Sequence, residues 1–219
     1  MTTWLSWSSG KDSAWSLHEL RRAGVPVTGL FTTLNTAFDR VAMHAVRREL
    51  LTAQARAAGL PLHVIEIPSP CPNADYERIM GAFVSHAKAS GVTEMAFGDL
   101  FLADIRAYRE RQLAGTGVTP IFPLWQRETR ALAEEMIAGG LVAHLTCIDP
   151  RRLDRAFAGR TFDAALLADL PAGVDPCGEN GEFHTFVSAG PMFADPQQIR
   201  RGEVVERDGF VFADLAPVG

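Results

Sequence analysis

Residues 4–17 read WLSWSSGKDSAWSL, which places a short strand, a serine- and glycine-rich turn and the start of a helix in direct succession. We expect the strand over residues 3–7 and the helix from about Asp12. In sheets of parallel strands, ligands bind beyond the carboxyl ends, and the first strand-to-helix turn is the usual phosphate site. Backbone N–H groups of that turn and the positive end of the helix dipole would face one anion. The stretch therefore predicts an α/β sheet with an anion site at its first turn.

The same succession recurs through the first 150 residues, where a helix ends at a glycine and an apolar run follows. The first two helices carry apolar stripes that stop at Gly24 and Gly59, and three more helices are predicted over 76–90, 104–113 and 131–138. The apolar runs lie at 25–34, 61–67, 93–100, 118–125 and 141–148. Strands that alternate with helices form βαβ units. We therefore expect residues 1–150 to form a doubly wound parallel sheet with helices on both sides.

After Pro150 this alternation stops. Two short helices, a glycine-punctuated loop that runs into a strand, and a hairpin that turns at Asp208-Gly209 are predicted in turn over 151–159, 163–170, 173–186 and 202–215. We expect residues 151–219 to form a small C-terminal α+β subdomain that packs on the edge of the first sheet.

Composition and charge exclude several classes of protein. A chain of 219 residues that is 47% hydrophobic can bury a sizeable core, and its net charge of −5 argues against nucleic acid as a partner. Arg47-Arg48 and Arg151-Arg152 could form a local basic patch, although solvated helix faces are the simpler interpretation. The sequence has neither a secretory signal pattern nor an apolar run of about 20 residues, so we expect a cytoplasmic protein without membrane contact.

The cysteines do not indicate a disulfide or zinc framework. Cys71, Cys147 and Cys177 are odd in number, far apart and without a CxxC pair. We therefore interpret each as a small core or loop residue and not as a nucleophile.

The first turn, Ser8 to Ser13, carries the groups that a pyrophosphate needs. Its three serines supply hydroxyl donors, Gly10 permits close approach of the backbone, and Lys11 adds a positive charge. The turn is not a Walker A loop, because that motif needs a glycine where Leu5 stands and a hydroxyl where Asp12 stands. A capped helix start with an exposed lysine is the structural alternative.

This turn resembles the S-G-G-K-D-S loop of the PP-loop, or N-type, ATP pyrophosphatases, with Ser9 in place of a glycine. A second stretch, CGENGEFHTFV at 177–187 followed by GPMF, resembles the C-G-E-G-G-E-[YF]-E-T signature of the diphthine–ammonia ligase family. Asn180 and His184 depart from that signature. Residues 44–62 and 122–140 also resemble family segments, so the likeness covers nearly the whole chain.

The resemblance implies a PP-loop fold of the HUP type and a ligase that uses ATP to amidate a carboxylate through an acyl-adenylate, with release of AMP and pyrophosphate. It implies ATP, ammonia and a small-molecule or protein carboxylate as partners, and Mg²⁺ as cofactor. The segment GDLFLADIRAYRERQ at 98–112 differs from the Y-Q-R-x-R-x-E segment of the family ligases. The composition fits a GC-rich bacterial gene, whereas diphthamide belongs to the elongation factor of eukaryotes and archaea. The acceptor therefore stays open, as does a homodimer.

The resemblance also suggests roles for residues on the ATP side. Lys11 would stabilise charge on the leaving pyrophosphate, and Asp12 would be either a magnesium ligand or a helix N-terminal acid. Other residues are expected beside the nucleotide: Ser8, Ser9, Gly10, Lys11, Asp12, Ser13, Thr32, Thr33, Leu34, His44 and Gly98. For Leu34 the alternative is ordinary core, and for His44 a structural role. Asp99 ends a strand on the same rim, where a carboxylate is catalytic or caps a helix.

Residues Glu179, Glu182 and His184 are the candidates for the amide-forming chemistry. If this segment runs into a strand, Glu182 and His184 share one face, because side chains alternate with a period of two. They could bind ammonia, take its proton or hold the acceptor, whereas the structural alternative is a turn with solvated acids. Two other functions remain open: a PP-loop enzyme that thiolates tRNA, and a non-catalytic ATP sensor.

Overall fold

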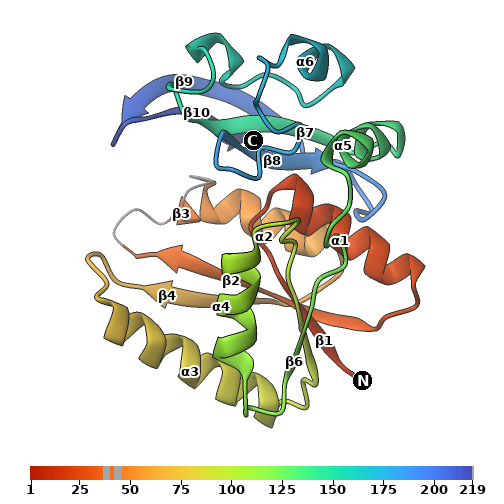
Figure 1. The fold of residues 1–219 in the computed structure, drawn as a ribbon, viewed down its shortest axis with the longest axis vertical. Coiled ribbons are helices and arrows are strands. Elements are labelled where there is room, and N and C mark those ends of the chain that lie inside the picture. The colour runs from red at the N-terminus through yellow and green to blue at the C-terminus, as the bar shows by residue number, and fades with distance from the viewer. Residues whose placement is uncertain (37–39, 42–45, 219) are drawn as a thin grey trace.

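The computed structural model describes residues 1–36, 40–41 and 46–218. It contains two sheets, with helices between them and on their outer faces (Figure 1).

The first sheet is the predicted parallel sheet. Its strands are β1 (Thr3–Ser6), β2 (Val27–Asn35), β4 (Leu62–Ile67), β5 (Glu94–Ala96) and β6 (Thr119–Ile121), with the short β3 (Arg40–Val41) antiparallel to the end of β2. The parallel pairs are β4 with β2, β2 with β1, β1 with β5, and β5 with β6. The chain thus builds outward from β1 to β4, then returns to the other side of β1. Such a reversal opens a crevice at the carboxyl ends, here between β1 and β5.

Helices cover both faces of this sheet, as predicted. They are α1 (Lys11–Arg22), α2 (Arg48–Ala57), α3 (Asn73–Ala89) and α4 (Ala103–Leu113). A further helix, α5 (Thr129–Ala138), lies beside the second sheet in Figure 1 and contacts α1, where the Trp15 indole N–H donates to Glu135 at 3.1 Å. Figure 1 shows α1 and α2 in the layer between the two sheets, and α3 and α4 on the opposite face of the parallel sheet. The larger core lies in this middle layer, where Leu17 and Leu50 are buried with Phe186 of the second sheet.

The second sheet is antiparallel, in the order β8-β7-β10-β9. Its strands are β7 (Val142–Ile148), β8 (Phe183–Ala189), β9 (Ile199–Arg207) and β10 (Phe210–Pro217). The apolar run at 141–148, which the alternation placed in the parallel sheet, is therefore the central strand β7 of the other sheet. Its burial on both faces made it resemble a parallel strand, since α6 (Ala164–Asp169) covers the outer face of this sheet (Figure 1). The proposed domain division after residue 150 remains a prediction.

The second sheet packs over α1 and α2 and not on the edge of the first sheet, which corrects our expectation. The Val187 N–H donates to the Ser9 carbonyl at 3.0 Å, and the Gln54 amide donates to the Val187 carbonyl at 2.7 Å. Arg21 of α1 donates to the Met192 carbonyl at 2.9 Å. These contacts attach the C-terminal part of the chain to the loop that follows β1 and to helices α1 and α2.

Local predictions in the C-terminal part are mostly confirmed. The hairpin turns at Asp208 and Gly209, whose φ angles of 52° and 79° are those a two-residue hairpin requires. The helix predicted over 163–170 is α6, which begins after an Asp163 cap. The stretch 151–159 forms only a short 3₁₀ turn, Arg155–Phe157.

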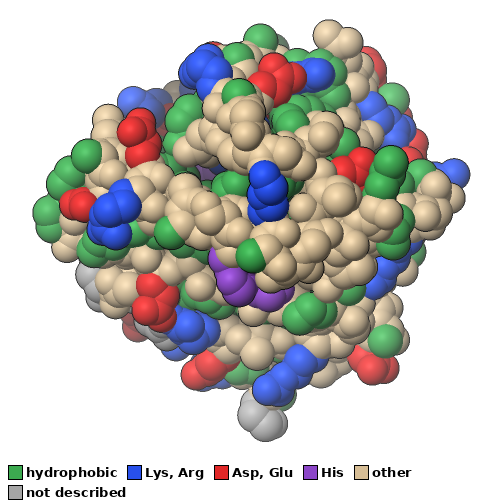
Figure 2. Space-filling view, turned by 90° about the horizontal axis from the view of Figure 1, so that it is seen from below, with side chains coloured by type: hydrophobic (Ala, Val, Ile, Leu, Met, Phe, Trp, Pro, Cys, Tyr) green, Lys and Arg blue, Asp and Glu red, His purple; other side chains and the backbone are tan. Residues whose placement is uncertain are grey.

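Figure 2 shows the face of the molecule seen from below the view of Figure 1. Histidine side chains gather near the centre of this face in Figure 2, and the described histidines that contact each other are His63 and His86, with ring centroids 6.4 Å apart. His63 also stacks on Trp4 at 3.8 Å. Basic and acidic side chains are interspersed on this face (Figure 2). No described helix has the length and apolar character needed to cross a membrane.

Candidate active site

A cleft of about 500 Å³ opens where the carboxyl ends of β1, β2 and β5 meet the loop before β8. Most of the predicted site residues line it: Ser8, Lys11, Asp12, Ser13, Thr32, Thr33, Gly98, Asp99, Glu179 and His184. The tertiary structure thus brings the two sequence motifs, which are about 170 residues apart in the chain, to one cavity.

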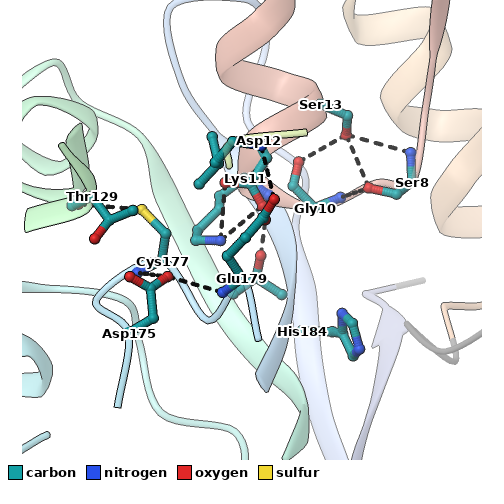
Figure 3. A network of polar contacts seen from close by, with 12 residues as sticks. Ser8, Gly10, Lys11, Asp12, Ser13, Thr129, Asp175, Cys177, Glu179 and His184 are labelled. Carbon is teal, nitrogen blue, oxygen red and sulfur yellow. Dashed lines mark hydrogen bonds and ion pairs between the residues drawn. The ribbon is translucent and has the colours of Figure 1, made fainter. Parts of the chain in front are cut away.

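The turn after β1 is organised by its own serines (Figure 3). The Ser13 hydroxyl donates to the Gly10 carbonyl at 2.9 Å and lies 3.2 Å from the Ser8 hydroxyl. Helix α1 begins at Lys11, and Gly10 at its N-cap has no side chain with which to cap it. The turn therefore presents hydroxyl groups and the positive end of a helix to the cleft, which is the arrangement that binds phosphate.

Ser9 supports this turn from behind and does not line the cleft. Its backbone adopts a φ of 68°, in the left-handed region that favours glycine, and its carbonyl accepts hydrogen bonds from Gln54 and Val187. The resemblance noted above places a glycine at this position, and the backbone explains why: a side chain in this conformation crowds the following carbonyl.

We predict that Ser9→Gly raises the free energy of unfolding by about 1 kcal/mol, because it removes the cost of a left-handed serine. Ser9→Ala keeps that cost and loses the hydroxyl that donates to the Ser8 carbonyl, so it should be less stable than the glycine variant. Urea unfolding of both variants measures the difference. A glycine variant less stable than the natural protein would contradict the prediction.

The buried Lys11 and the partly exposed Asp12 form an ion pair in the cleft (Figure 3). The Lys11 ammonium donates to both Asp12 carboxylate oxygens, at 3.0 and 2.8 Å, and lies 5.5 Å from the Phe183 ring centre. Burial acts to lower the pKa of Lys11, but the negative groups around it, Asp12 foremost, together hold that pKa above its ordinary value. The lysine is therefore positively charged in the cleft.

Gly98 lets the end of β5 approach the start of α1. A Cβ atom there would lie 3.0 Å from the Asp12 carbonyl carbon and 3.1 Å from the Ser13 nitrogen, which are backbone atoms that cannot move aside easily. Gly98 is thus part of the cleft for a steric reason, and it brings Asp99 next to the turn.

The loop before β8 directs Glu179 into the cleft. The Asp175 carboxylate accepts hydrogen bonds from the backbone N–H groups of Cys177 and Glu179, at 3.1 and 2.9 Å (Figure 3). The Glu179 carboxylate in turn accepts from the Leu100 N–H at 2.8 Å. Burial, helped by the negative charge of Asp12, raises the pKa of Glu179 to about 7. This carboxyl group can therefore gain or lose a proton near neutral pH.

Glu182 does not line the cleft. Our expectation that it shares one strand face with His184 is therefore wrong. The Glu182 side chain is fully buried, and its oxygens accept from the backbone N–H groups of Asp175 and Asn180, at 3.1 and 3.0 Å. Arg152 lies 3.5 Å from the same carboxylate. The residue precedes β8, so strand alternation does not apply to it. Glu182 therefore holds the loop together, whereas His184, inside β8, lines the cleft.

Glu182→Gln should lower the free energy of unfolding by about 2 kcal/mol, because its new N–H₂ group faces a backbone N–H and the charge near Arg152 is lost. Glu134→Gln, an exposed change on α5, is the matched control and should have little effect. Urea unfolding tests both variants. If the stability of Glu182→Gln equals that of the control, Glu182 does not hold the loop.

Three other predicted residues are placed differently from the rest. Leu34 is fully buried in the core and does not line the cleft, so its alternative interpretation fits the structure. Gly10 lies at the N-cap of α1 and does not line the cleft. His44 lies outside the described residues.

Sequence reasoning missed Asp175 and Arg109. Asp175 is followed by Pro176 and Gly178, a pattern typical of turns in which an aspartate accepts backbone hydrogen bonds, and this signal was available in the sequence. Arg109 of α4 reaches the cleft, and its Nε lies 3.9 Å from Asp99 Oδ2. No pattern in the sequence singled it out from its neighbours Arg106 and Arg111.

Comparison with known proteins finds similarity to diphthine–ammonia ligases. The family model described as "Diphthamide synthase C-terminal domain" matches residues 128–212, which include the loop that carries Glu179. The zebrafish (Danio rerio) diphthine–ammonia ligase is 26% identical over 97% of this chain and 90% of its own length. The human enzyme is 25% identical over 95% of this chain and 86% of its own length. The chain is thus similar to diphthine–ammonia ligases over nearly its whole length.

One similar protein is much longer than this chain. The diphthine–ammonia ligase of Schizosaccharomyces pombe is 24% identical over 91% of this chain, which corresponds to 36% of that protein. The similarity to these relatives thus extends across both sheets.

Proposed function

We propose that this chain, an ATP-dependent ligase of the diphthine–ammonia ligase family, forms an amide from a carboxylate and ammonia through an acyl-adenylate. One observation carries the proposal: Lys11 of the turn after β1 and Glu179 of the loop before β8 face the same cleft. A cation suited to phosphate and a carboxyl group that titrates near neutrality are the two groups such a reaction needs.

In the first step, a carboxylate oxygen of the acceptor attacks the α-phosphorus of ATP. A new P–O bond forms, the bond to the pyrophosphate oxygen breaks, and pyrophosphate leaves with the electron pair. Lys11 and the hydroxyls of Ser8 and Ser13 would bind the departing phosphates, because charge accumulates on them during the step. Thr32 and Thr33, at the end of β2, would contact the adenosine.

In the second step, ammonia attacks the acyl carbon, and the C–O bond to AMP breaks. AMP leaves with that electron pair, and the surplus proton of the attacking nitrogen passes to a base. We propose Glu179 as this base, since its pKa of about 7 lets the ionised form accept a proton at neutral pH. His184 lines the same wall and would contact the acceptor or ammonia.

A magnesium ion would be held mainly by the phosphates of ATP. Within the part of the chain that the structure describes, no group of three or more His, Cys, Asp or Glu side chains is arranged to hold a metal. Asp12 fits a single-carboxylate role, because Mg²⁺ commonly takes one or two carboxylates together with substrate phosphates. Bound there, the ion would neutralise phosphate charge.

The two buried cysteines, Cys147 and Cys177, give little support to a thiolating enzyme. Burial raises the pKa of Cys147 to about 12 and raises that of Cys177 further above its ordinary range. Neither thiol would be ionised at neutral pH, and the thiolate is the reactive form.

ATP with Mg²⁺ should raise the melting temperature more than AMP at the same concentration, because AMP lacks the phosphates that the turn contacts. Differential scanning fluorimetry measures both shifts. Release of AMP and pyrophosphate that depends on ammonia and a carboxylic acid would support the ligase. Equal stabilisation by AMP and ATP would place the phosphates elsewhere, and ATP binding without turnover in a broad screen of acids would favour a sensor.

A further inference from the structure

Arg109 and Asp99 form an incomplete ion pair on the wall of the cleft made by α4 and the end of β5. Their nearest atoms, Arg109 Nε and Asp99 Oδ2, are 3.9 Å apart, which is too far for a hydrogen bond. Both atoms are inaccessible to solvent, and within the described part of the chain neither has a hydrogen-bond partner. A buried N–H group without a partner is costly, and such groups in a folded protein call for an explanation.

The surroundings of Arg109 fix the direction of its guanidinium group. The guanidinium carbon lies 4.9 Å from the ring centre of Phe97, which holds the planar group by cation–π contact. The two side chains of the pair are only 26% and 19% exposed, so they are bordered by protein and open mainly into the cleft. Arg109 is thus held at the cleft, and its guanidinium group has an N–H donor without an acceptor among the described residues.

The charges in the cleft explain why a second cation is needed there. Lys11 is paired with Asp12 and would be engaged by the phosphates of ATP. An acceptor carboxylate must then approach the α-phosphate, and the two negative groups repel each other. A guanidinium group offers a planar fork of N–H donors that matches a carboxylate in geometry and charge.

The rest of this wall is apolar. Phe97, Met80 and Ile105 line the cleft beside Arg109, together with the ring of Tyr76. Met80 also lines a second hollow of about 430 Å³ between α3 and α4, so the two cavities adjoin. An acceptor bound with its carboxylate at Arg109 would lay an apolar body against these side chains, and a longer acceptor could extend toward the outer hollow.

We propose that Arg109 binds the carboxylate of the acceptor, and that the acceptor is an acid with an apolar segment next to its carboxyl group. The proposal rests on the ligase function proposed above and names its substrate class. In this role Arg109 is a specificity-determining residue, and Asp99 positions it.

The test uses ATP–pyrophosphate exchange with the full chain and a fixed panel of acids: butyrate, hexanoate, benzoate, phenylacetate and, as a short polar acid, glycolate. The matching amides are the chemical controls. Apolar acids should support exchange, whereas glycolate and the amides should not. Arg109→Gln should raise the KM for the acid roughly a hundredfold, because a charge-assisted hydrogen-bonded pair is lost. The KM of Arg109→Lys for the acid should lie between those of the natural protein and Arg109→Gln.

Arg106→Gln is the matched control, since Arg106 lies on the same helix as Arg109 but does not line the cleft. The KM for ATP and the ATP-induced rise in melting temperature should stay unchanged in all variants, which also shows that they fold.

An unchanged acid KM in Arg109→Gln, or exchange with no acid of the panel although ATP binds, would overturn the proposal. Loss of the ATP-induced shift in Arg109→Gln would assign the residue to the nucleotide and also overturn it. Failure of the ligase function itself would differ, because the natural protein would then show no ATP-induced shift, or would bind ATP without exchange in a broader screen that includes polar acids.

Discussion

Lys11→Met is expected to lower ATP turnover by at least about a hundredfold while the fold is kept. The ammonium group is the cation at the start of α1 that faces the cleft, and loss of one donor aimed at developing charge typically costs about 3 kcal/mol of transition-state stabilisation. Methionine keeps the length of the buried stem, so the packing against Phe183 changes little. Steady-state release of pyrophosphate measures the effect.

The sequence offers a matched control for this experiment. Lys88 is the other lysine of the chain, and it is exposed in the last turn of α3. Lys88→Met should leave turnover unchanged.

Because Lys11→Met leaves the carboxylate of Asp12 without its partner, the double variant Lys11→Met/Asp12→Asn separates lost stability from lost catalysis. Full turnover in a folded Lys11→Met protein would remove this lysine from the mechanism.

The second large effect is expected from Glu179→Gln, which should reduce amide formation roughly a hundredfold, as loss of a general base does. The amide oxygen of glutamine can still accept the Leu100 N–H, so the loop should keep its place. In the natural protein, the rate should rise with pH through about 7, because only the ionised carboxyl group can take a proton. In the glutamine variant this rise should be absent. The free-ammonia concentration is held constant across the series, so that ammonia ionisation does not contribute.

The pH dependence of the free energy of unfolding tests the titration of Glu179 independently. Because the folded pKa of Glu179 is about 7 and its ordinary value is 4.5, the folded state keeps a proton that the unfolded state has lost between these pH values. Stability from this group should therefore fall as pH rises across that window, and Glu179→Gln should remove the fall. Glu134→Gln on the exposed face of α5 is the control and should retain it. A rate rise through pH 7 that survives in Glu179→Gln would assign the base to another residue.

The sequence by itself determined the features that depend on neighbouring residues. The strand, turn and helix around Lys11 are contiguous, so their order alone predicted an anion site at the carboxyl end of β1. The hairpin at Asp208-Gly209 is equally local, because its two left-handed residues define the turn. The alternation of helices and apolar runs likewise predicted the parallel sheet, since such units can close in few ways.

Only the tertiary structure decided which sheet β7 joins and which acidic residue of the second motif enters the cleft. An apolar strand buried on both faces has the same pattern in either sheet, so its partners cannot be read from its residues. Glu179 and Glu182 lie in a turn with left-handed glycines at 178 and 181, where no periodic rule sets the direction of a side chain. Hydrogen bonds from the loop's backbone to Asp175 and Glu182 set that direction instead. Arg109 reaches the cleft because α4 packs against β6, the neighbour of β5 in the sheet, and that contact joins residues whose spacing in the sequence carries no signal.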